Sequence, residues 1–237
     1  MGEVSPPRAY EIVVAWVEER VLLGQLGVGD FLPSERELAG MLGVSRPAVR
    51  EGVRSLQAQG VLHSSVGAGR AGGTQVTAVP AGALARLLRL HVALANFPLD
   101  DVVEVRVALE RLSVRLACAR ATDEDLVRVG EQLQAMRDAT TREEFNDADA
   151  AFHVAIAQSS GNRLSTDTTI AIRESVRPPI LRGMARLSHE EYDELAVDLM
   201  REHEAIHAAV LARDAPVAEA LVEVHVREAW RRLRVVD

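Results

Sequence analysis

Residues 32–51 read LPSERELAGMLGVSRPAVRE, and this stretch decides the fold of the first part of the chain. It opens on Ser34, and Glu37 follows three residues later, which is the spacing of a capping box at a helix start. Apolar leucines follow at helical spacing, and Gly43 is a stop signal. We therefore expect a short helix that begins at about Ser34 and ends at Gly43.

A second helix follows after one intervening residue. Ser45 is its candidate N-cap, and we expect the helix to run from Arg46 to about Gln59. Pro47 fits the first turn, because amides there have no intrahelical partner. Two helices joined by a tight glycine turn form a helix-turn-helix.

The flanking segments extend this motif to a winged helix-turn-helix. Before it, apolar residues recur at helical spacing over about residues 8–23. After it, residues 61–66 and 74–77 have the pattern of two strands, joined by a glycine-rich tip at 67–73. Three helices and a two-stranded ribbon are therefore predicted in this order.

The start of the second helix of the motif holds the candidate base contacts. In such domains this helix enters the major groove, and its first turn meets base edges. Arg46 and Arg50 stand four apart on one face, and a guanidinium can bond guanine bidentately, while Ser45 offers a hydroxyl. The alternative is that these arginines form ordinary surface ion pairs with Glu35, Glu37 and Glu51.

Other residues are placed for the DNA backbone and the minor groove. Arg36 lies on the preceding helix, where it would meet phosphate and fix the register. At the tip of the ribbon, Gly67 allows close backbone approach and Arg70 offers a guanidinium to the minor groove.

The composition excludes other classes. Of 237 residues 48% are hydrophobic and 26% charged, and no apolar run approaches the roughly 18 residues of a membrane helix. One cysteine, Cys118, cannot form an intramolecular disulfide, which fits a reducing cytoplasm. The formal net charge is −8, but residues 1–79 carry seven arginines against eight acidic residues, and residues 80–237 carry twenty against twenty-seven. The acidity therefore lies in the second part, and with no lysine present every cation is an arginine.

The segments LPSERELA (32–39) and GVSRPAVRE (43–51) closely resemble the DNA-binding segment of GntR-family bacterial transcription regulators. The resemblance implies an operator of double-stranded DNA. It also implies contact roles for Arg36, Ser45, Arg46 and Arg50, with Gly67 as the wing glycine. Residues 68–73 look like an insertion relative to the shorter wing that is usual in this family.

Residues 80–237 show helical periodicity and no convincing strand pattern. Capping boxes recur at Thr141 with Glu144 and at Ser188 with Glu191. We expect six or seven helices and no third domain, hence an all-α bundle. The predicted fold is mostly α, with a winged helix-turn-helix domain over residues 1–79 and a helical domain over residues 80–237.

Four polar residues stand out in the helical part. Asp149 and His153 are four apart among apolar residues, so they share a helix face. His203 and His225 are each eleven residues from Asp214, so an antiparallel hairpin that turns there returns them to one level. One carboxylate and three imidazoles inside a bundle are the ligand set of a divalent metal site.

This part resembles the FCD effector-binding domain of the FadR-type GntR branch over about residues 98–234. The residues that carry the resemblance are Arg106 with Glu110, Asp149 with His153, Glu202 with His203, and His225. The resemblance implies that the Asp and three His hold zinc, nickel or manganese, and that a small organic carboxylate meets the metal. Arg106 either binds that carboxylate or pairs with Glu110. We therefore expect a homodimeric, non-enzymatic repressor that acts on a pseudo-palindromic operator.

Two other classes compete. Residues 203–207 spell HEAIH, the H-E-x-x-H signature of zinc metalloproteases, in which His203 and His207 would bind zinc and Glu204 would act as a base. Neither the metzincin continuation nor a preceding sheet pattern accompanies it. A purely structural dimer module would bind neither metal nor operator.

Overall fold

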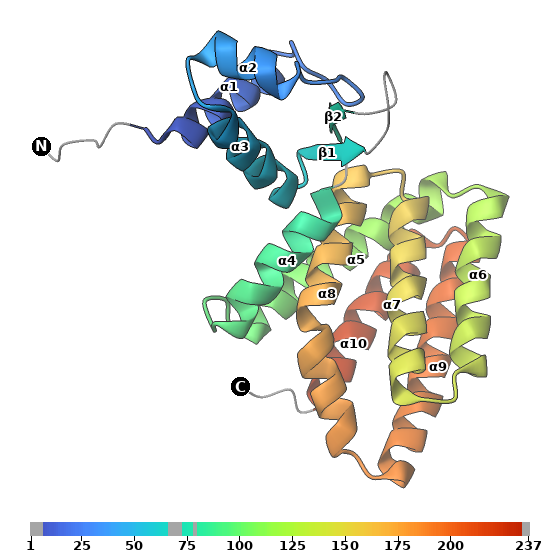
Figure 1. Ribbon diagram of the computed structural model, residues 1–237. Helices are drawn as coiled ribbons and strands as arrows, with labels where there is room; N and C mark the ends of the chain where they lie inside the picture. Colours follow the sequence, from blue (N-terminus) through green and yellow to red (C-terminus); the bar gives the residue numbers. More distant parts are fainter. Residues whose placement is uncertain (1–6, 66–72, 78–79, 234–237) are drawn as a thin grey trace, which may run out of the picture. The chain divides into compact units, whose positions relative to one another are not determined.

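The computed structural model describes residues 7–65, 73–77 and 80–233. The chain divides into two units, residues 1–83 and 84–237 (Figure 1). This division falls inside helix α4 (Pro80–Ala93), whereas the boundary set from the sequence lies at the beginning of that helix.

The first unit is a winged helix-turn-helix, as predicted. Its elements are α1 (Ala9–Leu22), α2 (Glu35–Leu42), α3 (Arg46–Ala58), β1 (Leu62–Ser65) and β2 (Gly73–Val76). The two strands pair antiparallel, with Leu62 opposite Val76. Buried apolar side chains from all of these helices form one core, which holds Val13, Val17, Leu38, Val49 and Leu56. Burial of this face holds α3 in place and leaves its polar first turn outside.

The helix ends of this unit follow their capping residues. The Ser34 hydroxyl accepts from the Glu37 amide, and the Glu37 carboxylate accepts from the Ser34 amide at 2.9 Å, which completes the capping box. Gly43 ends α2 with φ of 65°, in the left-handed region that favours glycine. Ser45 caps α3 by accepting from the Ala48 amide at 3.3 Å. The tight turn between α2 and α3 is therefore set by local chemistry.

The second unit is helical throughout its described part, as predicted, and with α4 the described residues from 80 onward form seven helices. The six that follow α4 are α5 (Leu99–Arg120), α6 (Asp123–Asp138), α7 (Arg142–Ser159), α8 (Arg163–Arg186), α9 (His189–Leu211) and α10 (Ala215–Arg232). Thr141 and Ser188 cap α7 and α9 through the predicted capping boxes. Asp214 caps α10 and so separates it from α9.

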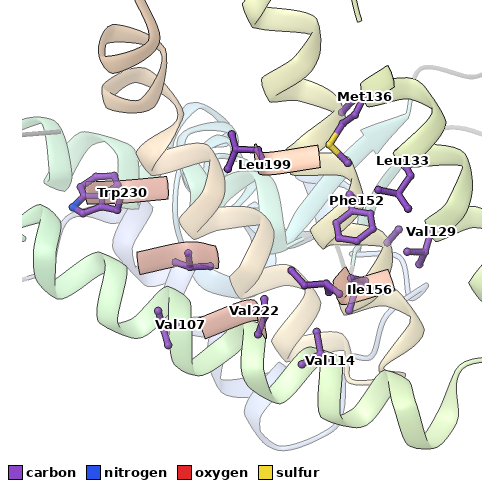
Figure 2. Packing of buried hydrophobic residues seen from close by; sticks show 14 of the residues in the cluster. Val107, Val114, Val129, Leu133, Met136, Phe152, Ile156, Leu199, Val222 and Trp230 are labelled. Carbon is purple, nitrogen blue, oxygen red and sulfur yellow. The ribbon is translucent and has the colours of Figure 1, made fainter. Parts of the chain in front are cut away.

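The helices of this unit enclose an apolar core (Figure 2). Helix α5 packs along α10 and also touches α7 and α8, while α6 lies against α7 and α9. Phe152 and Ile156 project from α7 into the core, where Val114 of α5 and Val222 of α10 also lie. This arrangement brings α5, α7, α8, α9 and α10 around one volume, which is where the polar site forms. Among the described helices none is both long and apolar enough to cross a membrane.

Candidate metal centre and nucleic-acid interface

Four side chains converge inside the helical unit. They are the four residues singled out from the sequence: Asp149, His153, His203 and His225. One candidate ligand atom from each lies within 4.8 Å of all the others. His203 Nε2 is 3.2 Å from His153 Nε2 and 2.9 Å from Asp149 Oδ1. The three imidazoles are buried, and Asp149 is nearly so.

Local helix geometry and one hairpin explain this convergence. Asp149 and His153 are one turn apart on α7, so they face the same way. Helices α9 and α10 form a hairpin that turns at Asp214 and pack against each other. Their packing brings the ring centroids of His203 and His225 to 4.4 Å from each other. The Phe152 ring stands edge-on to His203 at 5.0 Å and closes the apolar side of the cluster.

Each imidazole is anchored through its Nδ1. The acceptor is the Leu199 carbonyl for His203, at 2.7 Å, and a Glu202 oxygen for His225, at 2.7 Å. His153 Nδ1 is in ion-pair contact with Glu110 Oε2, at 2.5 Å. Because an oxygen can only accept, each Nδ1 carries the hydrogen, and each Nε2 presents its lone pair to the cluster.

These donors fit a divalent metal ion. Two nitrogen lone pairs face each other across 3.2 Å between His153 and His203, an arrangement that needs a cation or a proton between them. Burial lowers the pKa of His153 to about 3, with Arg173 adding to the effect, and burial holds the pKa of His225 well below its usual value. A proton is therefore disfavoured at neutral pH. A metal-bound histidine usually donates from one ring nitrogen to a carboxylate or carbonyl, while its other ring nitrogen binds the metal.

Charged side chains of α5 and α8 lie next to the cluster. Arg106 Nε donates to Glu110 Oε1 at 2.7 Å, and both side chains are buried. Arg173 NH1 donates to Asp149 Oδ2 at 3.0 Å, and its NH2 lies 3.4 Å from Glu110 Oε1. Of the two roles left open for Arg106, the structure contains the pair with Glu110, in a buried rather than an exposed form.

The arginines keep both acids ionised. Burial alone raises the pKa of Glu110 and of Asp149, but Arg173 and the neighbouring histidines outweigh it and hold both pKa values well below their ordinary range. Burial and the charge of Arg106 lower the pKa of Arg173 to about 10, so Arg173 remains protonated at neutral pH. Arg173 was not predicted, because nothing in the spacing along α8 marks this position as facing the cluster.

The competing H-E-x-x-H pattern does not assemble. His207 lies outside the cluster. Its ring packs against Gly130 of α6, where a Cβ atom added to that glycine would lie 3.6 Å from the ring. Glu204 is exposed and accepts from Arg137 at 2.6 Å. The two histidines of the pattern thus lie in different places, His203 in the cluster and His207 against α6.

The first turn of α3 presents the predicted base-reading residues to solvent. Arg46 and Arg50 are both more than half exposed, at 59% and 55% of their side chains. Arg50 Nε donates to Glu35 at 2.8 Å, and Arg46 NH2 lies 3.9 Å from the same oxygen. The ion-pair alternative is therefore present for Glu35, but such exposed pairs contribute little and exchange readily for a phosphate or a base.

Of the other four predicted DNA contacts, two are among the described residues and two are not. Arg36 is exposed on α2. Gly67 and Arg70 lie outside the described residues. Ser45 is exposed and its hydroxyl caps α3, so its oxygen already has one intramolecular role.

Two family models match the chain. The model described as "Bacterial regulatory proteins, gntR family" matches residues 9–71, and the model described as "FCD domain" matches residues 101–228. The first covers α1, α2, α3 and β1 of the winged unit, and the second covers all four members of the candidate metal cluster.

Curated relatives align over nearly the whole chain. A "Glc operon transcriptional activator" of Escherichia coli (strain K12) is 29% identical, over 96% of this chain and 89% of its own length. The "HTH-type transcriptional repressor NanR" of Klebsiella aerogenes is 26% identical over 94% of this chain and 85% of its own length. An HTH-type transcriptional regulator of Mycobacterium tuberculosis, Rv0494, is 30% identical over 97% of this chain and 92% of its own length.

Solved structures share the fold. A GntR protein of Streptococcus agalactiae superposes with a TM-score of 0.57 at 24% identity, over 94% of this chain and 99% of that one. E. coli McbR/YncC superposes with a TM-score of 0.52 at 19% identity, over 96% and 98% of the two chains.

Proposed function

This chain belongs to the GntR family of bacterial regulatory proteins and carries a C-terminal FCD domain, and from this membership we propose that it is a homodimeric, metal-containing repressor released by a small organic acid. Regulation of transcription is the function of this family, and the chain is not an enzyme. We assign DNA binding to residues 1–79, and effector binding, metal binding and dimerisation to residues 80–237. Because its proposed partner is operator DNA, we propose that it acts in the bacterial cytoplasm.

The DNA-binding part of the proposal rests on α3. We assign base contacts to Arg46 and Arg50, a base or phosphate contact to Ser45, and a phosphate contact to Arg36. Gly67 and Arg70 complete the interface at the wing. The exposure of both α3 arginines, with only an exchangeable pair to Glu35, supports this assignment. Two such domains in a dimer would match a pseudo-palindromic operator.

The metal part rests on one observation, the buried convergence of one carboxylate and three Nδ1-anchored imidazoles. We propose that Asp149, His153, His203 and His225 hold zinc, with nickel or manganese as other divalent ions that suit the donors. A bound divalent ion supplies open coordination positions to an organic carboxylate. Arg106 is the proposed second contact for that carboxylate, and binding there would shift the helices that carry the cluster.

Metal content of the purified protein tests the site. We expect about one divalent ion per chain by elemental analysis, and loss of that ion in the His153→Ala, His225→Ala double variant. His207→Ala is the matched control, since it removes a histidine of the same helical unit outside the cluster and leaves the metal in place. Full metal content in the double variant, or loss in the control alone, contradicts the assignment.

Selection of bound duplexes from a random DNA library tests operator recognition. We expect a two-fold symmetric consensus. Arg46→Ala or Arg50→Ala should relax base preference at one position of each half-site, and Arg36→Ala should weaken all sites evenly. Unchanged selectivity in Arg50→Ala across a salt series would contradict the base-reading role.

A further inference from the structure

Arg173 is a buried cation with a free binding edge. Its side chain is 5% exposed, and NH1 donates to Asp149 Oδ2. Within the described part of the chain its buried Nε and NH2 atoms have no hydrogen-bond partner. These two nitrogens form the edge of a guanidinium that pairs with a carboxylate through two parallel hydrogen bonds. Among the described residues Nε has no hydrogen-bond partner, and NH2 has only its 3.4 Å ion-pair contact with Glu110 Oε1. Buried donors without hydrogen bonds are costly, so this edge points to a missing acceptor.

Once a divalent metal ion is bound, the charges around Arg173 no longer balance, and the anionic groups of a ligand can offset the positive excess. Arg106 and Arg173 both approach a single oxygen, Glu110 Oε1, at 2.7 and 3.4 Å. Two guanidinium groups, Arg106 and Arg173, then balance two carboxylates, Glu110 and Asp149, and the metal-bound imidazoles are neutral. Glu202, beside His225, is itself paired with Arg232 at 3.5 Å. A divalent ion therefore adds two positive charges that the four described ligand residues do not offset. Buried charge without compensation is strongly unfavourable.

The same arginine can be reached from the surface. It lines a groove of about 540 Å³ between α7 and α8, the two helices that lie side by side in Figure 1. Asn146 also lines the groove, is buried, and has an Oδ1 atom without a hydrogen-bond partner among the described residues. Farther along, Arg177 pairs with Asp147 at 2.7 Å. The groove thus extends to the side chain of Arg173, which forms part of its wall.

We propose that Arg173 binds one anionic group of the effector, and that the effector is a small dianion such as a dicarboxylate, with its other carboxylate at the metal. This inference rests on the proposed metal site and names the ligand class for it. Asp149 joins the two anion acceptors, because Oδ1 faces the histidines while Oδ2 accepts from Arg173. Arg173 and the candidate metal ligands therefore share one carboxylate, and this closeness favours a short diacid.

Titration calorimetry on the zinc-loaded full chain tests the inference. The probes are malonate, succinate and glutarate, each compared with its own monoamide, and acetate. The monoamide keeps the size of the diacid and removes one charge. We expect at least one diacid to bind about tenfold or more tightly than its monoamide, as a charge-assisted bidentate pair implies.

Variants of Arg173 show whether this residue binds the second carboxylate of the diacid. In Arg173→Gln the preference for the diacid should fall to about threefold or less, while Arg173→Lys should keep part of it. Arg177→Gln is the matched control, one turn further along α8 and at the same groove, and should leave the preference unchanged. The comparison of diacid with monoamide on the parent protein stands even where a variant does not fold.

Three results would overturn the inference: no diacid bound by the zinc-loaded parent protein, a monoamide bound as tightly as its diacid, or an unchanged preference in Arg173→Gln. Zinc content and operator binding are measured on the same preparations. Loss of either in the parent protein counts against the proposed function. A zinc-loaded, operator-binding protein that is indifferent to the second carboxylate counts only against the role of Arg173.

Discussion

The strongest structural prediction concerns Glu110, the carboxylate at the centre of the buried charges. It is 2% exposed, and it meets Arg106 Nε at 2.7 Å and His153 Nδ1 at 2.5 Å. Glu110→Gln preserves the shape and removes the charge, so it leaves two buried guanidinium groups with Asp149 as their only carboxylate in the cluster. Breaking a buried ion pair from one side costs about 3–5 kcal/mol.

Unfolding of the chelated protein measures this cost without any contribution from metal binding. For a helical unit of this size, a loss of about 3–5 kcal/mol corresponds to a fall in Tm of about 6–20 °C. Glu104→Gln is the matched control, on an exposed position of the same helix α5, and its effect should stay within about 0.5 kcal/mol.

A double variant separates the lost ion pair from general damage. Arg106→Gln combined with Glu110→Gln removes both partners, so the uncompensated guanidinium disappears with the carboxylate. The double variant should recover about 1 kcal/mol or more relative to the sum of the two single variants. A cost below about 1 kcal/mol for Glu110→Gln, or strict additivity of the two substitutions, would refute this account of the buried charges.

Three further predictions follow from other parts of the molecule. Zinc at a free concentration of about a thousand times its Kd should raise the free energy of unfolding of the helical unit by about 4 kcal/mol, measured by thermal unfolding with and without chelator; an effect that persists in the His153→Ala, His225→Ala variant would contradict it. In the metal-free protein the pKa of His153 is about 3 when folded and near its ordinary value of 6.5 when unfolded. The free energy of unfolding should therefore fall as the pH drops from 6.5 toward 3, by about 1.4 kcal/mol per pH unit for this group. Denaturant titrations from pH 7 to 4 should show a shallower dependence on pH in His153→Asn. Gly52→Ala should destabilise the winged unit by about 1–3 kcal/mol and weaken operator binding, because its Cβ would lie 2.8 Å from Val13 Cβ; unchanged unfolding of that unit would contradict the close packing of α1 on α3.

Much of the fold could be predicted because its signals are local. A capping box such as Ser34 with Glu37 joins atoms three residues apart, so the residue types alone locate the start of a helix. Gly43 shows the same dependence at the end of α2, where its left-handed backbone makes the tight turn. The winged helix-turn-helix is a sequence of such short-range features and therefore follows from the residues in order.

The four members of the candidate metal site were also within reach of the sequence. Helical periodicity places Asp149 beside His153, and equal distances from Asp214 place His203 level with His225. Periodicity gives the face of one helix, but it does not say which faces meet. The convergence of α7 with the α9 and α10 hairpin became known only from the packed structure.

What only the tertiary structure decided is the environment of those four residues. Arg173 is on α8, Glu110 is on α5, and their contacts with Asp149 and His153 join atoms 24 and 43 positions apart in the chain. No local pattern encodes such contacts, because they depend on how whole helices pack. The sequence by itself determined the helices, the turn that positions α3 and the set of candidate ligands. Packing determined the protonation of the histidines, the sharing of Glu110 by two arginines and the free edge of Arg173, since each depends on burial and on neighbours that are distant in the chain.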